Sequence, residues 1–348
     1  MRQTFEYFIV DPGTWKDVKK LKCVKASTIT RDAKAGTLGS ATIDVTESIG
    51  ECYIRIYLVT VQKDVEERFP LGTFLVQTPS SSFNGKIRNI SMDAYTPLLE
   101  LKENPPPLGY SLLKGDNIME KAYMLCREQA RAPVVETDCN TTLHYDFVSD
   151  PNDTWMTFLS DLISNAKYIF AIDELGRILF APKQDTASLQ PVWTYNDDNS
   201  SILLPDLTMN HDMYGIPNVV EVVYSNGGDH LYAKVVNDDP NSPISTINRG
   251  REIKHRVTDP DLVGNPTESQ IQEYAERLLR ELSSLEYTVT YKHGYCPVQI
   301  GDCVRLNYAS AGLTNVKAKV ISQTINCRPG CSVTETAVFT NKLWGDNL

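Results

Sequence analysis

The strongest pattern of hydrophobic and polar positions lies in the first half of the segment Asp150–Pro182. Apolar residues recur there at helical spacing, which predicts a helix with one buried face. Asp153 or Thr154 can begin this helix by accepting a hydrogen bond from its first turn, and Asn165 can end it. The buried face is expected to consist of Trp155, Phe158, Leu159, Leu162 and Ile163.

The second half of the same segment predicts a β-hairpin. Tyr168–Ile172 and Arg177–Phe180 are rich in Ile and Phe, which favours strands. Between them, Gly176 can adopt the positive φ that a tight turn requires. We therefore expect a helix packed on a small hairpin, a unit that buries a core, holds its neighbours and carries no catalytic group.

Residues 1–104 contain short runs of β-branched and aromatic residues separated by turn signals such as Asp11-Pro12-Gly13. This spacing is typical of a barrel or a sandwich. Three prolines in the segment Asn104–Gly109 predict a stiff linker, because proline cannot join a sheet ladder, so a domain boundary is expected there. The predicted strands are Glu6–Val10, Val24–Thr30, Ala41–Val45, Tyr53–Val61, Thr73–Gln77 and Ile87–Ala94, with a turn at Asn84-Gly85.

Residues 105–190 are predicted to form a mixed α+β middle domain. Asp116 can cap a helix that runs to about Arg131, and Pro133 ends it. The helix and hairpin of Asp150–Pro182 complete this middle domain.

Residues 191–348 return to a β-rich pattern with one inserted helix at 267–285. Thr267 and Gln270 have the spacing of a capping box, and apolar residues follow at helical spacing. The predicted strands are Pro217–Tyr224, Leu231–Val236, Tyr287–Tyr291, Cys303–Tyr308, Val316–Gln323 and Ser332–Phe339, with a turn at Asn226–Asp229 and a loop at Asp259–Asp261. The predicted fold class is therefore α+β and β-rich, with two β-rich ends around a mixed helix and hairpin middle.

The charge balance is acidic, with 34 Lys and Arg against 44 Asp and Glu and a net charge of −10. This balance disfavours binding to a nucleic-acid backbone and suits a soluble surface past which DNA can slide. No run of about 18 apolar residues occurs, so no membrane-spanning helix is expected. The N-terminus has no signal-peptide core, so we expect assembly in a cytoplasm.

No nucleotide-binding, serine-hydrolase or zinc-protease motif occurs in the chain. His293 and Cys296 could form a nucleophilic pair, but residues three apart in a β-rich region usually point in opposite directions. The acidic pairs Asp197-Asp198 and Asp238-Asp239 lack the spacing of a calcium loop and suit solvated turns. We therefore expect no enzymatic activity.

Four of the eight cysteines fall near the C-terminus, at Cys296, Cys303, Cys327 and Cys331. Four thiolates can hold zinc or an iron–sulfur cluster, and these cysteines lie near predicted strand ends. The alternative is that they are small buried hydrophobic residues, as free cysteines commonly are. Spacing alone leaves both interpretations open.

Five segments in order along the chain carry a resemblance to a known family. They are Ile29–Val45, Leu71–Thr78, Asp93–Leu101, Asp150–Pro182 and Ile300–Leu306. In this order and spacing they resemble the tail or baseplate hub proteins of long-tailed phages, prophage-derived particles and contractile injection systems. The resemblance covers nearly the full chain.

The resemblance implies a structural protein of the virion tail. Such hubs are homotrimers, and each subunit carries two tube-like β-barrel domains, so that three subunits match a sixfold tail tube. The implied partners are the tail tube protein, a central spike or fibre, the tape-measure protein and other baseplate proteins, with DNA only in transit. On this view, residues 1–104 and 191–348 are the two barrel domains and 105–190 is the middle domain.

The resemblance also bears on the cysteines, because some tail-tip proteins of this kind hold a C-terminal iron–sulfur cluster. It implies a [4Fe-4S] cluster on Cys296, Cys303, Cys327 and Cys331, with zinc as the alternative. Larger hubs continue into a peptidase or lysin, whereas this chain stops at Leu348. A tail-associated cell-wall hydrolase and a carbohydrate-binding receptor module remain as alternatives, although the four tryptophans are dispersed along the chain rather than clustered for sugar binding.

Overall fold

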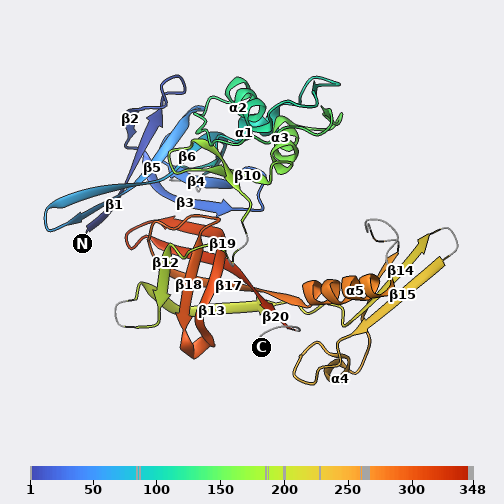
Figure 1. The fold of residues 1–348 in the computed structure, drawn as a ribbon. Helices are drawn as coiled ribbons and strands as arrows, with labels where there is room; N and C mark the ends of the chain where they lie inside the picture. The colour runs from blue at the N-terminus through green and yellow to red at the C-terminus, as the bar shows by residue number, and fades with distance from the viewer. Residues whose placement is uncertain are drawn as a thin grey trace. The chain divides into compact units, whose positions relative to one another are not determined.

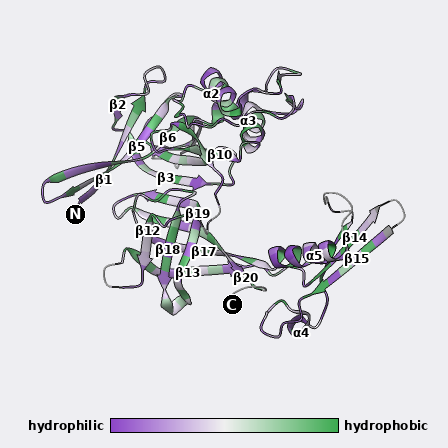
Figure 2. Cartoon of the chain, in the orientation of Figure 1, coloured by the Kyte–Doolittle hydropathy of each residue, from purple (hydrophilic) through white to green (hydrophobic). Residues whose placement is uncertain are grey.

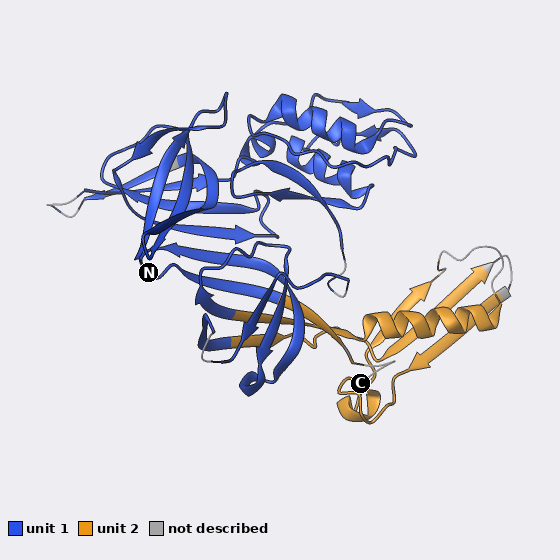
Figure 3. Ribbon diagram, turned by 60° about the vertical axis from the view of Figure 1, so that its left-hand side comes forward, with its two compact units in different colours: residues 1–207, 291–337 blue, residues 208–290, 338–348 orange. Residues whose placement is uncertain are grey.

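A computed structural model describes residues 2–83, 85, 88–184, 186, 188–198, 201–226, 229–258, 260 and 267–343. Its contacts divide the chain into two compact units (Figure 3). Unit 1 comprises Met1–Leu207 and Tyr291–Ala337, and unit 2 comprises Thr208–Thr290 and Val338–Leu348. These bounds differ from the predicted division at 104 and 190, which stays a prediction.

The largest element is a 13-stranded sheet (Figure 1). Its strand order is β13-β17-β20-β19-β3-β4-β7-β6-β5-β1-β2, with β12 and β18 off this path. Its N-terminal strands are β1 (Arg2–Val10), β2 (Asp17–Leu21), β3 (Val24–Asp32), β4 (Gly39–Val45), β5 (Tyr53–Gln62), β6 (Val65–Phe83) and β7 (Arg88–Tyr95). Its later strands are β12 (Trp193–Asn196), β13 (Leu203–His211), β17 (Ser284–Gly294), β18 (Cys303–Tyr308), β19 (Leu313–Cys327) and β20 (Ser332–Lys342).

The two β-rich ends of the chain share this sheet, because β19 pairs antiparallel with β3 from Ser322↔Asp32 to Cys327↔Ser27. The path has two free ends, at β13 and β2, and none of the sheets formed by the described residues closes on itself. The prediction of a β-rich α+β fold is confirmed. Two separate barrels are not confirmed, because the ladder between β3 and β19 joins strands that were assigned to different barrels.

Alternating burial in these strands explains the sheet's apolar core. In β4 every second residue is buried, including Ile43 and Val45, while Thr42 and Asp44 point to the other face. Ile29, Ile54 and Met92 join the same core from neighbouring strands. β2 shows no strand pattern in the sequence, because its Lys-rich segment is mostly exposed and lies at the edge of the sheet.

The middle of the chain packs three helices on a hairpin (Figure 1). These are α1 (Leu99–Glu103), α2 (Ile118–Gln129) and α3 (Trp155–Ser164), with β10 (Tyr168–Ile172) paired to β11 (Ile178–Pro182). Two short strands flank α2 in the sequence and pair with each other. They are β8 (Ser111–Leu112) and β9 (Phe147–Val148). All five apolar positions predicted for α3 are buried.

The helix caps confirm the predicted ends of α3 and correct the predicted start of α2. Thr154 caps α3 and forms a capping box with Thr157, and Asn165 is the C-cap. For α2 the cap is Asn117, whose side chain accepts from Met119 N and Glu120 N, so the prediction of Asp116 is wrong by one residue. Asn competes equally well with Asp at this position, so the sequence alone does not separate them.

Unit 2 is built on a three-stranded sheet of order β15-β14-β16. Its elements are β14 (Val219–Asn226), β15 (Asp229–Val236), α4 (Thr246–Arg249), β16 (Lys254–Thr258) and α5 (Glu268–Leu282). The predicted capping box of Thr267 and Gln270 is present. The helix ends at Leu282 rather than 285, because Ser284 already begins β17.

The core of unit 2 lies between α5 and the β14–β15 pair. Ile271, Ala275 and Leu279 of the helix pack with buried residues of the two strands, namely Val220, Val222, Ala233 and Val235. Figure 2 shows that the side of α5 turned toward the viewer is largely hydrophilic, as expected for an amphipathic helix on one face of a sheet.

Parts of several predicted turns lie outside the described residues, at 84, 227–228, 259 and 261. Among the helices of the described ranges, none combines the length and apolar character that crossing a membrane requires.

Candidate functional site

The turn of the β10–β11 hairpin is held in shape by its own residues. Gly176 has a φ of 75°, the conformation predicted for it. Arg177 N donates to Asp173 Oδ1 at 2.8 Å, and Gly176 N donates to the carbonyl of Asp173 at 2.9 Å. The turn therefore presents the two residues at its tip, Glu174 and Leu175, in a fixed geometry.

The backbone of this tip is bound by side chains of the N-terminal part of the chain, from the β1–β2 connection and from β5 and β6. The Leu175 carbonyl accepts from Trp15 Nε1 at 2.7 Å and from Arg55 Nη2 at 3.1 Å. The Glu174 carbonyl accepts from the Thr73 hydroxyl at 3.3 Å. The hairpin of the middle region thus closes onto the large sheet through defined hydrogen bonds.

The side chain of Glu174 reaches a different part of the chain. Its carboxylate accepts from Gln299 Nε2 at 2.5 Å and lies 3.5 Å from Arg31 Nη2. A cavity of about 30 Å³ lies beside Glu174, Arg31 and Gln299, which is room for water but not for a substrate. This junction therefore connects three segments of unit 1 and offers no pocket for chemistry.

A second polar cluster is fully buried in unit 1. Tyr291 donates to Glu335 Oε1 at 2.5 Å, and Tyr195 donates to the same oxygen at 3.3 Å. His293 Nε2 lies 3.5 Å from Glu335 Oε2, and Gln323 Nε2 donates to that oxygen at 2.6 Å. Each carboxylate oxygen thus has two polar partners, which is what a buried charge needs in order to be tolerated.

His293 is charged in this environment. Desolvation by burial lowers its pKa, but hydrogen bonds to Cys296 and Glu335 and the charge of Glu335 outweigh that effect and raise the pKa to about 9. Desolvation and the neighbouring Glu335 raise the pKa of both Tyr195 and Tyr291, which therefore stay neutral. The cluster is a buried ion pair with satisfied hydrogen bonds.

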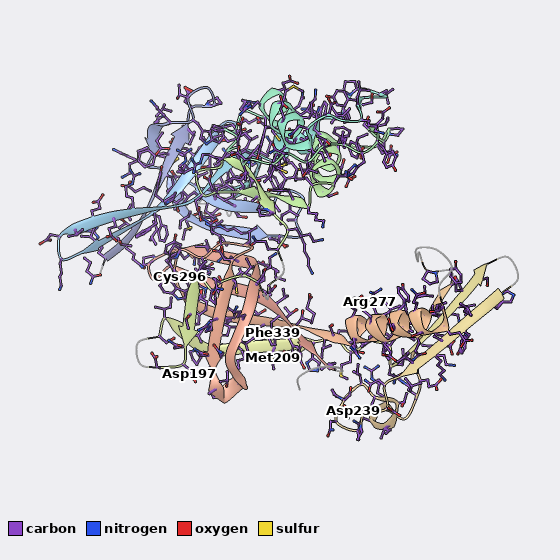
Figure 4. The ribbon with its side chains drawn as sticks, in the orientation of Figure 1. Asp197, Met209, Asp239, Arg277, Cys296 and Phe339 are labelled. Atoms are coloured by element: carbon purple, nitrogen blue, oxygen red, sulfur yellow. The ribbon has the colours of Figure 1, made fainter. Side chains whose placement is uncertain are left out.

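The structure brings His293 and Cys296 together, contrary to the expectation from strand alternation. The Cys296 thiol lies 3.8 Å from His293 Nδ1 and 3.1 Å from the Tyr195 hydroxyl. The expectation was wrong because β17 ends at Gly294, so strand alternation does not extend to Cys296, which is labelled in Figure 4. Both side chains are buried, so the pair lacks the solvent access that a nucleophile for an external substrate needs.

The four C-terminal cysteines occupy different surroundings. Cys296 belongs to the buried polar cluster, and Cys303 begins β18 opposite Lys319 of β19. Cys327 ends β19 and Cys331 precedes β20, and both lie in the apolar core of the large sheet.

These different surroundings bear on the predicted four-sulfur site. Within the ranges that the structure describes, no group of three or more His, Cys, Asp and Glu side chains is placed to share a metal ion. Burial also raises the pKa of Cys303, Cys327 and Cys331, which favours thiols over the thiolates that bind metal. The iron–sulfur cluster and its zinc alternative stay predictions, and no chemistry is assigned to them.

Several large apolar side chains of the middle region are exposed. Leu108 is 86% exposed and Tyr145 is 80% exposed, and Leu113 and Val148 are also well over half exposed. Leu113 directly follows β8, and Val148 belongs to β9, where it pairs with Ser111 of β8. Single exposed apolar side chains are common on protein surfaces, whereas a contiguous patch of them marks a surface that is buried on assembly.

No protein-family model matches the sequence, and no curated protein matches it either. Solved structures match the fold over nearly the whole chain. The tail protein from Neisseria meningitidis MC58 is 14% identical with a TM-score of 0.64, covering 99% of this chain and 98% of that chain. The 43 kDa tail protein of prophage MuSo2 from Shewanella oneidensis is 11% identical with a TM-score of 0.63, covering 96% and 98%.

A third solved structure agrees with these two. Prophage tail protein gp18 from Listeria monocytogenes EGD-e is 11% identical with a TM-score of 0.51, covering 97% of this chain and 95% of that chain. The chain therefore has the fold of phage tail proteins. The predicted resemblance is confirmed at this level, and the match extends from one end of the chain to the other.

Proposed function

We propose that this protein is a structural hub of a phage-type tail tip or baseplate. The observation that carries the proposal is the end-to-end match in fold to the Neisseria meningitidis tail protein. The two polar sites of unit 1 support a structural role, because one is a junction between segments and the other is a buried ion pair.

In this proposal the chain acts as a homotrimer. Three copies join a sixfold tail tube to a central spike or fibre, contact the tape-measure protein and form the end of the DNA channel. The exposed apolar side chains of the middle region, such as Leu108 and Tyr145, support a chain that buries further surface on assembly. Two tube-like modules per subunit, formed from the strands of the large sheet, remain part of the proposal.

Light scattering on the purified chain, alone and mixed with its tail tube protein, tests the proposal. We expect a mass near three times 39.0 kDa for the chain alone or, where only the complex assembles, the mass of three copies of the chain plus that of the bound tube protein. A chain that stays monomeric at all concentrations, and also with the tube protein present, would contradict the hub. Labelled antibody on intact particles should place the protein at the tail tip.

The proposal includes the absence of enzymatic activity. Peptidoglycan zymography of the purified chain should show no clearing. Clearing that disappears in a Cys296→Ser variant but persists in Cys303→Ser would instead support the hydrolase alternative. Iron and zinc analysis of protein purified without oxygen tests the cluster prediction directly, because a [4Fe-4S] cluster requires about four irons per chain.

A further inference from the structure

The turn between β19 and β20 places two cysteines at matching positions on its two sides. Cys327 is the last residue of β19, and Cys331 immediately precedes the first residue of β20, Ser332. Asn326 Nδ2 donates to the Ser332 hydroxyl at 3.2 Å, so these two residues are neighbours across the hairpin. One step closer to the tip, Cys327 and Cys331 flank the three-residue segment 328–330.

The tip is closed by backbone hydrogen bonds. Cys331 N donates to the Arg328 carbonyl at 2.8 Å, and Arg328 N donates to the Asn326 carbonyl at 2.8 Å. Gly330 has a φ of 97°, which lets the chain reverse within three residues. Cys331 has a φ of 36° and so also belongs to the tight turn. The Cα atoms of a disulfide lie about 4.4–6.8 Å apart, a separation that residues on the two sides of so short a turn can reach.

The two side chains point into the same environment. Cys327 is 4% exposed and Cys331 is 0% exposed, and both belong to the apolar core that also contains Ile325 and Val333. Their thiols are close enough to interact, since Cys327 adds to the effect of burial in raising the pKa of Cys331 to about 12. Cys303 lies apart from this pair, on β18 opposite Lys319.

We propose that Cys327 and Cys331 are a dithiol that closes to a disulfide across the β19–β20 turn when the protein meets an oxidising environment. With a low-molecular-weight disulfide as the oxidant, both cysteine thiols give up their protons and one S–S bond forms between them. The S–S bond of the small disulfide breaks, and it is reduced to two thiols. The pair therefore acts separately from Cys296 and Cys303 rather than as half of a four-cysteine cluster.

Both thiols are free in the structure, and their burial limits the access of an oxidant to them. Burial raises the pKa of Cys327 to about 11, so little of the reactive thiolate is present at neutral pH. The tip is further held by Gly330 N, which donates to Gln3 Oε1 at 3.0 Å. Oxidation is therefore expected to be slow and to be reversed by a reducing agent.

Mass spectrometry of the full chain tests the proposal. The protein is purified with a reducing agent, exposed to oxidised glutathione, quenched with acid and alkylated under denaturing conditions. We expect the intact protein to lose two hydrogen atoms and the number of alkylated cysteines to fall from eight to six. Fragment mapping of the wild-type protein should place the new bond between Cys327 and Cys331.

Single variants supply the controls. Cys327→Ser and Cys331→Ser should each abolish the loss of two hydrogens, whereas Cys303→Ser should retain it. No loss in the wild-type protein, or a mapped bond that includes Cys296 or joins Cys23 to Cys52, would overturn the proposal. About four irons bound per chain and released by Cys327→Ser would overturn it as well. The mapping needs no variant, so a variant that fails to fold does not leave the question open.

Discussion

The indole Nε1 of Trp15 donates a 2.7 Å hydrogen bond to the backbone carbonyl of Leu175, 160 residues further along the chain. Arg55 donates to the same carbonyl at 3.1 Å. Two donors, one from the β1–β2 connection and one from β5, therefore converge on one oxygen at the tip of the β10–β11 hairpin. Since a buried carbonyl without partners is costly, this contact fixes where the hairpin sits on the sheet of unit 1.

Arg55 is the residue on which this junction depends most. Its side chain is 6% exposed and donates to Asp17 Oδ1 at 2.8 Å and Thr73 Oγ1 at 2.9 Å as well as to Leu175. Arg55→Ala leaves the Asp17 carboxylate without its charge partner, so we expect the free energy of unfolding to fall by about 3–5 kcal/mol. Urea denaturation followed by tryptophan fluorescence measures the change.

Arg68→Ala is the matched control for Arg55→Ala. Arg68 lies in the same sheet, pairs with Glu6 at 3.2 Å and stacks on Tyr57, but its side chain is 39% exposed. Exposed pairs contribute little, so a loss of no more than about 1 kcal/mol is expected. Equal losses in the two variants would show that burial of the Arg55 network does not stabilise the fold.

Gly176 tests the close approach of the hairpin to the sheet. A Cβ at this position would lie 2.7 Å from Thr73 Cβ, and the φ of 75° is unfavourable for alanine. We expect Gly176→Ala to cost more than the ~1–2 kcal/mol of the φ penalty alone, because the turn must move away from Thr73. Loss of near-ultraviolet circular dichroism from Trp15 should accompany the loss of stability.

Gly109→Ala separates the two costs. Gly109 has a φ of 74°, but among the described residues no heavy atom lies within 4 Å of an added Cβ. The free energy of unfolding of Gly109→Ala should therefore fall only by the cost of the unfavourable φ. If both variants have the same free energy of unfolding, the contact between the turn and Thr73 is not tight in solution.

The sequence predicts structure well where the determining interactions are local. The capping box of Thr267 and Gln270, the buried face of α3 and the positive φ of Gly176 each depend on residues within a few positions of one another. The pairing of β19 with β3 depends on residues almost 300 positions apart, and no local pattern specifies it. For this reason the strands were predicted and the single shared sheet was not.

One feature of the sequence indicates the buried polar cluster, namely a carboxylate within an alternating strand. Val333, Glu335, Ala337 and Phe339 alternate along β20, so the carboxylate lies on the apolar side of a strand. A buried carboxylate requires a positive partner and further donors. The identity of those partners, His293 and Tyr291 on β17, follows only from the strand order of the folded sheet.

Leu279 tests the core of unit 2 separately from unit 1. It is fully buried in α5 against the β14–β15 pair, so Leu279→Ala should leave a cavity that costs about 2–5 kcal/mol. Amide hydrogen exchange in β14 and β15 should become faster, while exchange in β4 and β5 should not change. Arg280→Ala, at an exposed position of the same helix, should not change hydrogen exchange in either pair of strands. A uniform increase across both units would show that they unfold as one.

His293 makes stability depend on pH through its pairing with Glu335. Its pKa rises from 6.5 to about 9 on folding. The folded state therefore holds the proton more tightly than the unfolded state, and the contribution is complete below pH 6.5. It is lost as pH rises toward 9, by up to ~3 kcal/mol for a shift of this size. Urea unfolding at a series of pH values should show stability decreasing across this interval.

Substitution distinguishes this ion pair from other titrating groups. His293→Gln removes the group that titrates, so the decrease in stability between pH 6.5 and 9 should disappear, even though the variant is less stable at neutral pH because Glu335 loses its charge partner. His255→Gln, at an exposed histidine of β16, should keep the decrease. If His293→Gln retains the wild-type pH profile, another group is responsible and His293 is neutral in the folded protein. The imidazole proton resonances of His293 in the wild-type protein, followed by NMR over a series of pH values, would then titrate well below pH 9.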